Sequence, residues 1–191
     1  MSQAPAPVPA EPAPARVVVP TATGAHLLER SQRVPGTLEE VFAFFGQPAN
    51  LERLTPGDMR FRVHAMDTPE LGDGTLIDYR LSVKGLPLRW RSRIVSWEPP
   101  PRFVDVQVKG PYRTWHHLHA FEQHRNPITG APEVEVTDRV HYTVLSDAPL
   151  LRPLEDLLDR LFVRRDVARV FEFRRAKMAE LFPARPEPMT L

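Results

Sequence analysis

Cysteine is missing from all 191 residues of this chain. Its absence excludes disulfide bonds, thiol catalysis and metal sites made of thiolates. Long apolar runs are missing as well, since no stretch approaches the roughly 20 apolar residues that span a bilayer. The N-terminal segment lacks the basic and then apolar regions of a secretory signal. We therefore expect a cytoplasmic protein without stable membrane insertion.

Charge of neither sign dominates the composition. Lysine and arginine together number 25, and aspartate and glutamate 24, so the protein has no overall field that would gather nucleic acid. We expect no nucleic-acid partner, and the oligomeric state stays open. Gly72 and Gly74 are typical of a turn, and the sequence holds no phosphate-binding loop or dinucleotide fingerprint.

Proline is abundant, and it divides the chain. Residues 1–24 are rich in proline and alanine and offer almost nothing to bury, so we expect a disordered tail there. A second short tail is expected over residues 183–191. The segment between them, residues 25–182, is long enough for one domain with a sizeable core.

The first part of this domain predicts a strand and two short helices. The strand is expected over residues 25–34. Thr37 is a suitable N-cap for a helix that ends at Gly46, with apolar residues at helical spacing between them. A second helix over residues 49–55 should end before Pro56, because a residue that precedes proline disfavours helical backbone.

Alternation of apolar and polar residues then predicts six strands. A period of two indicates an antiparallel sheet with one buried face and one face in water. The strands are expected at residues 60–67, 75–83, 88–97, 102–108, 113–121 and 134–144.

From Pro149 onward the period returns to 3.6 residues and predicts one helix of roughly thirty residues. Its apolar stripe includes Leu154, Leu157, Leu161 and Phe171, and we expect it to face the core. The whole order is an α+β pattern. It predicts a curved antiparallel sheet of six to seven strands wrapped around a long C-terminal helix, with two short helices after the first strand.

Three stretches resemble the START-like superfamily of helix-grip folds, the polyketide cyclase and Bet v 1-type (SRPBCC) proteins. They are SQRVPGTLEEVFAFFGQPANLERLTP (31–56), WRSRIVSWEPPPRFVDVQVKGPYRTWHHLHAF (90–121) and RRDVARVFEFR (164–174). They look most like a small bacterial ligand-binding branch. The resemblance implies an apolar cavity between sheet and long helix for a hydrophobic or aromatic molecule. It implies no common catalytic set, because these proteins share a cavity rather than a chemistry.

Three of the seven histidines lie within the strand expected at residues 113–121. Alternation puts Trp115, His117, His119 and Phe121 on one face of that strand. This face should be the covered one, since burying both aromatic side chains is worth several kcal/mol. We therefore expect His117 and His119 inside the grip and His116 outside.

Asp138 falls in the inward row of the following strand, together with Tyr142. In the register that sets Phe121 opposite Val134, a histidine lies opposite this aspartate. That histidine is His117. A shift of two residues would keep the same faces but change the partners.

Three interpretations of His117 stay open. It can belong to a buried polar network with Asp138, because an inward carboxylate needs a partner. It can be the general acid or base of a cyclase or dehydratase-type enzyme, oriented by Asp138. It can also join His119 and Asp138 around zinc or non-haem iron, although no fourth ligand is evident. We expect no metal and no cofactor.

The sequence thus predicts a binding protein for a hydrophobic or aromatic small molecule. The residues expected to line its cavity are Tyr79, Trp90, Trp115, His117, His119, Asp138 and Tyr142. One alternative is the enzyme that uses His117 and Asp138. Another is a membrane-associated lipid or quinone carrier, which would expose apolar residues near KGLPL (84–88) and KGPY (109–112).

Overall fold

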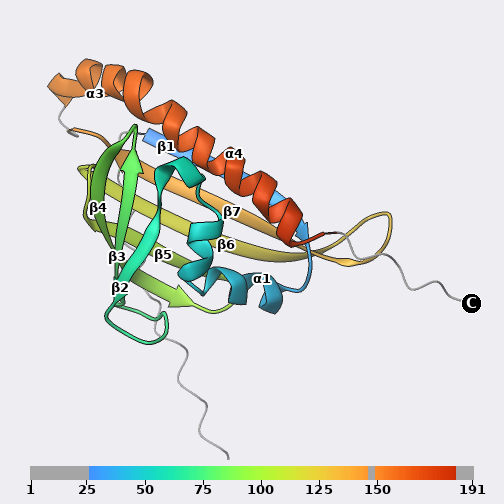
Figure 1. Cartoon of the computed structure of the whole chain (residues 1–191). Coiled ribbons are helices and arrows are strands. Elements are labelled where there is room, and N and C mark those ends of the chain that lie inside the picture. Colours follow the sequence, from blue (N-terminus) through green and yellow to red (C-terminus); the bar gives the residue numbers. More distant parts are fainter. Residues whose placement is uncertain (1–25, 146–148, 184–191) are drawn as a thin grey trace, which may run out of the picture.

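The computed structural model describes residues 26–145 and 149–183 (Figure 1). The two predicted tails lie outside the described residues, apart from Pro183. No helix in the described ranges is both long and apolar enough to cross a membrane.

Seven antiparallel strands form one curved sheet, as predicted (Figure 1). Their order across the sheet is β1-β7-β6-β5-β4-β3-β2, so the first strand closes against the last and all other neighbours are consecutive. The strands are β1 (His26–Pro35), β2 (Arg62–Met66), β3 (Leu76–Val83), β4 (Leu86–Glu98), β5 (Arg102–Lys109), β6 (Thr114–Arg125) and β7 (Pro132–Thr143).

Two short helices follow β1, also as predicted. Helix α1 (Leu38–Phe45) begins with a capping box, in which the Thr37 side chain accepts from the Glu40 amide and the Glu40 carboxylate accepts from the Thr37 amide. Helix α2 (Ala49–Arg53) comes next. A 3₁₀ turn, η1 (Gly57–Met59), then leads into β2.

The long C-terminal helix lies across the concave face of the sheet (Figure 1). After a 3₁₀ turn, η2 (Pro149–Leu151), it consists of three consecutive parts. These are α3 (Arg152–Leu158), a π-helical turn η3 (Asp159–Val163) and α4 (Arg164–Leu181). One long helix is therefore confirmed, with a π turn where its two parts meet.

The predicted apolar stripe is correct for α4 and wrong for α3. In α4, Val167, Phe171 and Met178 are buried against the sheet. In the α3 and η3 segment, Leu154, Leu157 and Leu161 are exposed and Leu158, also predicted in the stripe, is half-buried. The buried residues among the described side chains of this segment are Glu155 and Asp159.

Hydrogen bonds to the end of β7 explain this rotation of α3. The Glu155 carboxylate accepts from the backbone amides of Val144 and Leu145. The Asp159 carboxylate accepts from the Tyr142 hydroxyl at 2.7 Å. Amides left unpaired at the partly buried end of a strand are costly, so satisfying them outweighs the burial of a few leucine side chains.

The core consists of two apolar clusters under the grip. The larger one is built around Phe42, whose ring meets those of Phe103 and Phe121 edge to face. The smaller one contains Tyr142 and Phe171. The cavity described next borders both clusters and is not filled by either.

Candidate functional site

A cavity of about 330 Å³ lies between the concave face of the sheet and the long helix. Its volume falls in the range of about 300–1,000 Å³ that is usual for small-molecule sites. Aromatic rings make up much of its wall, and they come from Phe61, Tyr79, Trp90, Tyr112, Trp115 and Phe171. The Trp90 and Trp115 rings meet edge to face at 5.2 Å between centroids.

Five of the residues predicted to line the cavity do so. They are Tyr79, Trp90, Trp115, His117 and His119.

The remaining two, Asp138 and Tyr142, are not among the lining residues. Asp138 is held by Arg174 and His117, and the Tyr142 hydroxyl donates to Asp159. Both side chains point inward as predicted. Each side chain is hydrogen-bonded to a partner within the protein and does not line the cavity.

The predicted register between β6 and β7 is wrong by two residues. Asp138 lies opposite His119, and His117 lies opposite Val140. The side chains nevertheless reach across the diagonal, and His117 Nε2 donates to Asp138 Oδ1 at 2.8 Å. His119 Nδ1 lies 3.0 Å from the same oxygen, so one carboxylate oxygen is in contact with both rings.

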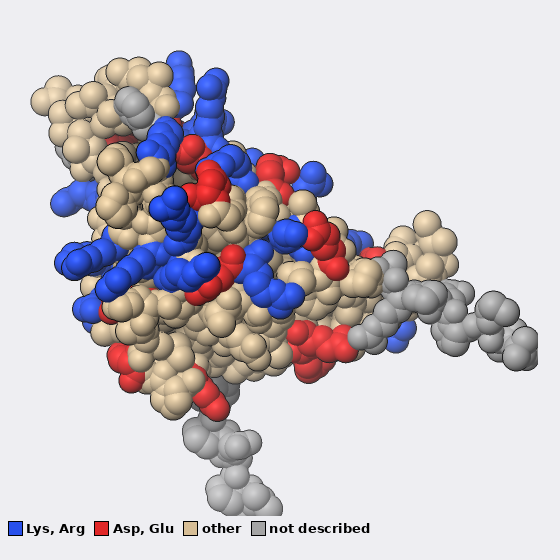
Figure 2. Space-filling model, viewed as in Figure 1, with Lys and Arg blue, Asp and Glu red and all other residues tan. Residues whose placement is uncertain are grey.

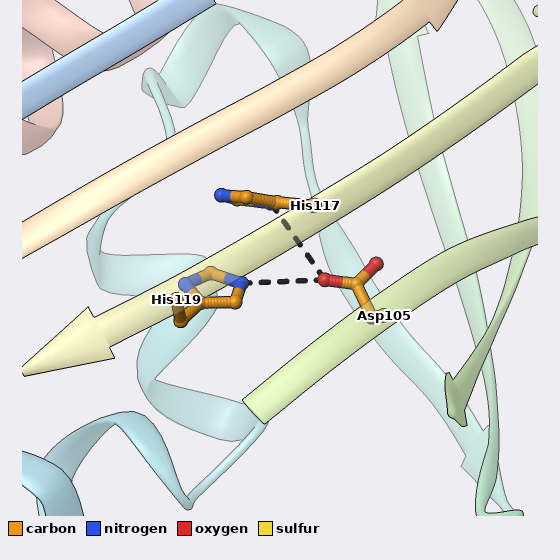
Figure 3. A group of neighbouring side chains, drawn as sticks. All are labelled: Asp105, His117 and His119. Atoms are coloured by element: carbon orange, nitrogen blue, oxygen red, sulfur yellow. Dashed lines mark hydrogen bonds and ion pairs between the residues drawn. The ribbon is translucent and has the colours of Figure 1, made fainter. Parts of the chain in front are cut away.

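Asp105 of β5, which the sequence analysis missed, contacts both histidines from the other side (Figure 3). Its Oδ2 lies 3.2 Å from His119 Nε2 and 3.6 Å from His117 Nδ1. Its Oδ1 accepts from Ser92 at 3.1 Å. The sequence did hold a signal for Asp105, because it lies two residues after the buried Phe103 in β5 and therefore on the same face of the strand.

Arg174 of α4 completes the group and was also missed. Its Nη1 donates to Asp138 Oδ1 at 2.9 Å, and the side chain lines the cavity. It lies on the buried stripe of α4, three residues after Phe171 and four before Met178. A charged residue at such a position predicts a buried ionic partner.

Several solved structures share this architecture. No protein-family model and no curated protein matches the sequence. Among solved structures, the di-domain ARO/CYC protein BexL from the BE-7585A biosynthetic pathway has a TM-score of 0.57 at 18% identity, covering 84% of this chain and 51% of its own. The Zhui aromatase/cyclase from Streptomyces sp. R1128 has a TM-score of 0.54 at 11% identity, covering 82% and 95%.

Ara h 8.0201, a Bet v 1-like protein, has a TM-score of 0.51 at 15% identity and covers 82% of this chain and 97% of its own. The chain has the helix-grip fold. At these identities the match concerns architecture alone, so the chemistry of this helix-grip cavity must come from its own residues.

The two histidines have pKa values displaced in opposite directions. Burial, together with the neighbouring charge of His119, lowers the pKa of His117 to about 4. Burial also disfavours the cation of His119, but its contacts with Asp105 and Asp138 outweigh that cost and raise its pKa. The rings lie only 3.8 Å apart, so protonating one opposes protonating the other.

The two carboxylates carry their charges down to low pH. Burial alone would raise the pKa of Asp138, but Arg174 and the two histidines hold it well below its usual value. Burial likewise opposes the charge of Asp105, and its contacts with His119 and His117 lower its pKa. With His119 protonated and His117 neutral, two positive charges balance two negative ones. Such balance makes a buried ionic group tolerable.

A metal ion is a further chemical possibility for this helix-grip site. Ligand atoms of Asp105, His117 and His119 lie within 4.8 Å of one another (Figure 3). The third member is thus Asp105, and the predicted third ligand, Asp138, is not in this group. A cation here would have to replace the contacts that Asp105 already makes with both rings, so the geometry is better explained as a hydrogen-bonded network.

His116 lies outside the grip as predicted, yet its side chain is buried. It lies in the outward row of β6, but it is only 8% exposed. Its neighbours on adjacent strands, Val106 and His141, lie in the middle of the sheet and flank it closely. Position in a central strand therefore buries this side chain even on the outer face.

Proposed function

We propose that the cavity binds a hydrophobic or aromatic small molecule with a polar group at one end. The observation that carries this proposal is a cavity of about 330 Å³ with aromatic walls and one ionic corner. The corner contains Asp105, His117, His119 and Arg174. Sites of this kind gain affinity from apolar contact and orientation from a few polar groups.

The ionic corner indicates which polar groups a ligand would present. The Nε–H of Arg174 is buried and has no hydrogen-bond partner among the described residues. A carbonyl or carboxylate of the ligand would accept from it. A ligand hydroxyl would donate to Asp105, as Ser92 does now. A phenol or a hydroxylated aromatic ketone has this combination of groups.

The solved structures with this fold give independent support. One of them is described as an aromatase/cyclase and another as a di-domain ARO/CYC protein. An aromatic ligand would match the rings of Trp90, Tyr112 and Trp115, which form adjacent walls of the cavity. The proposed location is the cytoplasm, with which a chain that lacks cysteine is compatible.

Filling the cavity tests the proposal. Val170 lines the cavity, and Val170→Phe would place a ring inside it. We expect this variant to lose binding of an apolar fluorescent probe such as anilinonaphthalene sulfonate. Val108→Phe, at a half-exposed position, is the matched control. Equal probe binding by both variants would contradict the proposal.

Acid–base chemistry on the bound molecule is a second candidate function. The observation that favours it is the pair of adjacent imidazoles at the cavity wall, 3.8 Å apart between ring centroids, one with a lowered and one with a raised pKa. Two neighbouring groups whose pKa values are shifted in opposite directions can act as a base and an acid. Here neutral His117, oriented by Asp138, would accept a proton, and His119 would supply one.

His117→Gln separates binding from catalysis. Glutamine can still donate to Asp138, so the fold and the ligand affinity should change little. Turnover of a bound polyketone or hydroxyketone should fall at least about a hundredfold if His117 is the base. Unchanged turnover would exclude this role.

A further inference from the structure

In the first part of the long helix, apolar side chains are exposed and charged side chains are buried. Leu150, Leu154, Leu157 and Leu161 are 89%, 44%, 49% and 55% exposed. Leu154 and Leu157, three residues apart, lie on one side of α3. Leu150 in the preceding turn η2 lies four residues before Leu154, and Leu161 in η3 lies four residues after Leu157. We call these four residues the leucine face.

The protein holds this orientation firmly. Glu155 and Asp159 occupy the opposite side of the helix and are 0% and 5% exposed. They accept hydrogen bonds from the Val144 and Leu145 amides and from the Tyr142 hydroxyl. Turning the leucines inward would break all of these bonds. The hydrogen bonds of Glu155 and Asp159 thus keep the leucine face directed toward the surroundings.

Positive charge surrounds the leucine face. Arg152, Arg160, Arg164 and Arg165 are exposed in this segment. Asp156, the one exposed carboxylate among residues 150–165, pairs with Arg152 at 3.5 Å. Figure 2 shows Lys and Arg side chains gathered beside the uncharged surface of α3. The segment therefore presents a clear excess of positive charge, although the whole chain carries a net charge of only +1.

We propose that the leucine face docks the protein on an anionic lipid bilayer. Exposed leucines flanked by arginines are what an interfacial helix needs, because its apolar side enters the acyl region while the cations meet lipid headgroups. A second copy of the chain fits less well. A twofold contact of this face with itself would bring its arginines together.

The docked segment would lie beside the cavity. Val163 and Asp166, just after the leucine face, line it. Asp166 also pairs with Lys84 of the β3–β4 turn at 3.2 Å, and Leu86, the first residue of β4 after that turn, is 69% exposed. Docking would therefore bring this wall of the cavity close to the bilayer. A link between docking and ligand uptake rests on the proposed ligand binding, whereas the docking itself does not.

Vesicle co-sedimentation tests the docking. The full-length protein would be mixed with phosphatidylcholine vesicles with and without phosphatidylglycerol, at low and at high salt. We expect binding to the anionic vesicles only, weakened by salt. The double variant Leu154→Gln with Leu157→Gln should bind about tenfold more weakly, since two leucine side chains no longer leave water. Ile128→Gln, at a 92% exposed position in the β6–β7 turn, is the matched control and should bind like the parent protein.

Three results would overturn the proposal. They are no binding to anionic vesicles, equal loss of binding in the control, and a dimer in light scattering that the double variant abolishes. Thermal unfolding of each variant shows whether its fold is kept. Val170→Phe should still bind vesicles, and the double variant should still bind the apolar probe, so a failure of docking is distinguishable from a failure of ligand binding.

Discussion

His117 and Asp138 are hydrogen-bonded at 2.8 Å although they are not opposite each other in the sheet. The bond crosses the ladder diagonally, from β6 to a residue of β7 whose direct partner is His119. A single carboxylate oxygen thereby contacts two imidazoles and a guanidinium. Arg174 is the residue through which the long helix joins this group.

Arg174→Met should destabilise the protein strongly. It leaves the buried Asp138 without its permanent cation, which typically costs about 3–5 kcal/mol. Urea unfolding measures the loss. Adding Asp138→Asn to Arg174→Met should restore part of the stability, because it removes the uncompensated charge. Arg175→Met, at an exposed neighbouring position, should change stability by less than about 0.5 kcal/mol.

Acid should destabilise the protein through His117. Its pKa is about 4 in the folded state, against an ordinary value of 6.5. Between these values the unfolded chain binds a proton that the folded protein refuses, so the free energy of unfolding falls as pH decreases. From pH ~6.5 to ~5 this contributes about 1–2 kcal/mol.

His117→Gln should flatten that dependence, as measured by urea unfolding at both pH values. An equally steep dependence in the variant would assign the acid sensitivity to other groups. His119 acts in the opposite direction. Its raised pKa stabilises the fold fully below the ordinary value, and this contribution is lost as pH rises through the folded-state pKa.

Trp115→Leu should weaken binding of an aromatic ligand by about tenfold, because it removes an aromatic contact from the cavity wall. Calorimetric titration measures the change. Trp97→Phe is a suitable comparison, since Trp97 packs in the core beside Phe42 and does not line the cavity. Similar losses in both variants would contradict a specific role of Trp115.

Glu155→Gln should loosen the first part of the long helix. The carboxylate accepts from two backbone amides, and glutamine has a single acceptor oxygen. We expect a cost of about 1–3 kcal/mol and faster amide hydrogen exchange in residues 150–161 than in α4. The exposed Asp156→Asn is the control, and uniform exchange across both helical parts would refute local anchoring.

Local patterns in the sequence predicted the fold well. The Thr37 cap, the alternation in the strands and the return to a helical period each indicate one element with little dependence on its neighbours. Alternation also identified the inward row of Trp115, His117 and His119.

Such patterns could not predict the register between β6 and β7 or the rotation of α3 about its axis. A shift of two residues preserves every face, so alternation could not decide which residue of β7 meets His117. Asp105 and Arg174 come from other elements, and their meeting depends on how the sheet curves around α4. The leucines of α3 have core-like spacing. Their direction was decided by Glu155 and Asp159, which bind the end of β7.

Native mass spectrometry of protein purified gently from its own host tests ligand binding most directly. We expect a noncovalent adduct with the mass of a hydrophobic organic molecule. It should be absent from Val170→Phe purified in the same way, because that ring would occupy the cavity. An adduct of equal abundance in Val170→Phe would show that the cavity is not the binding site and would contradict the proposed function.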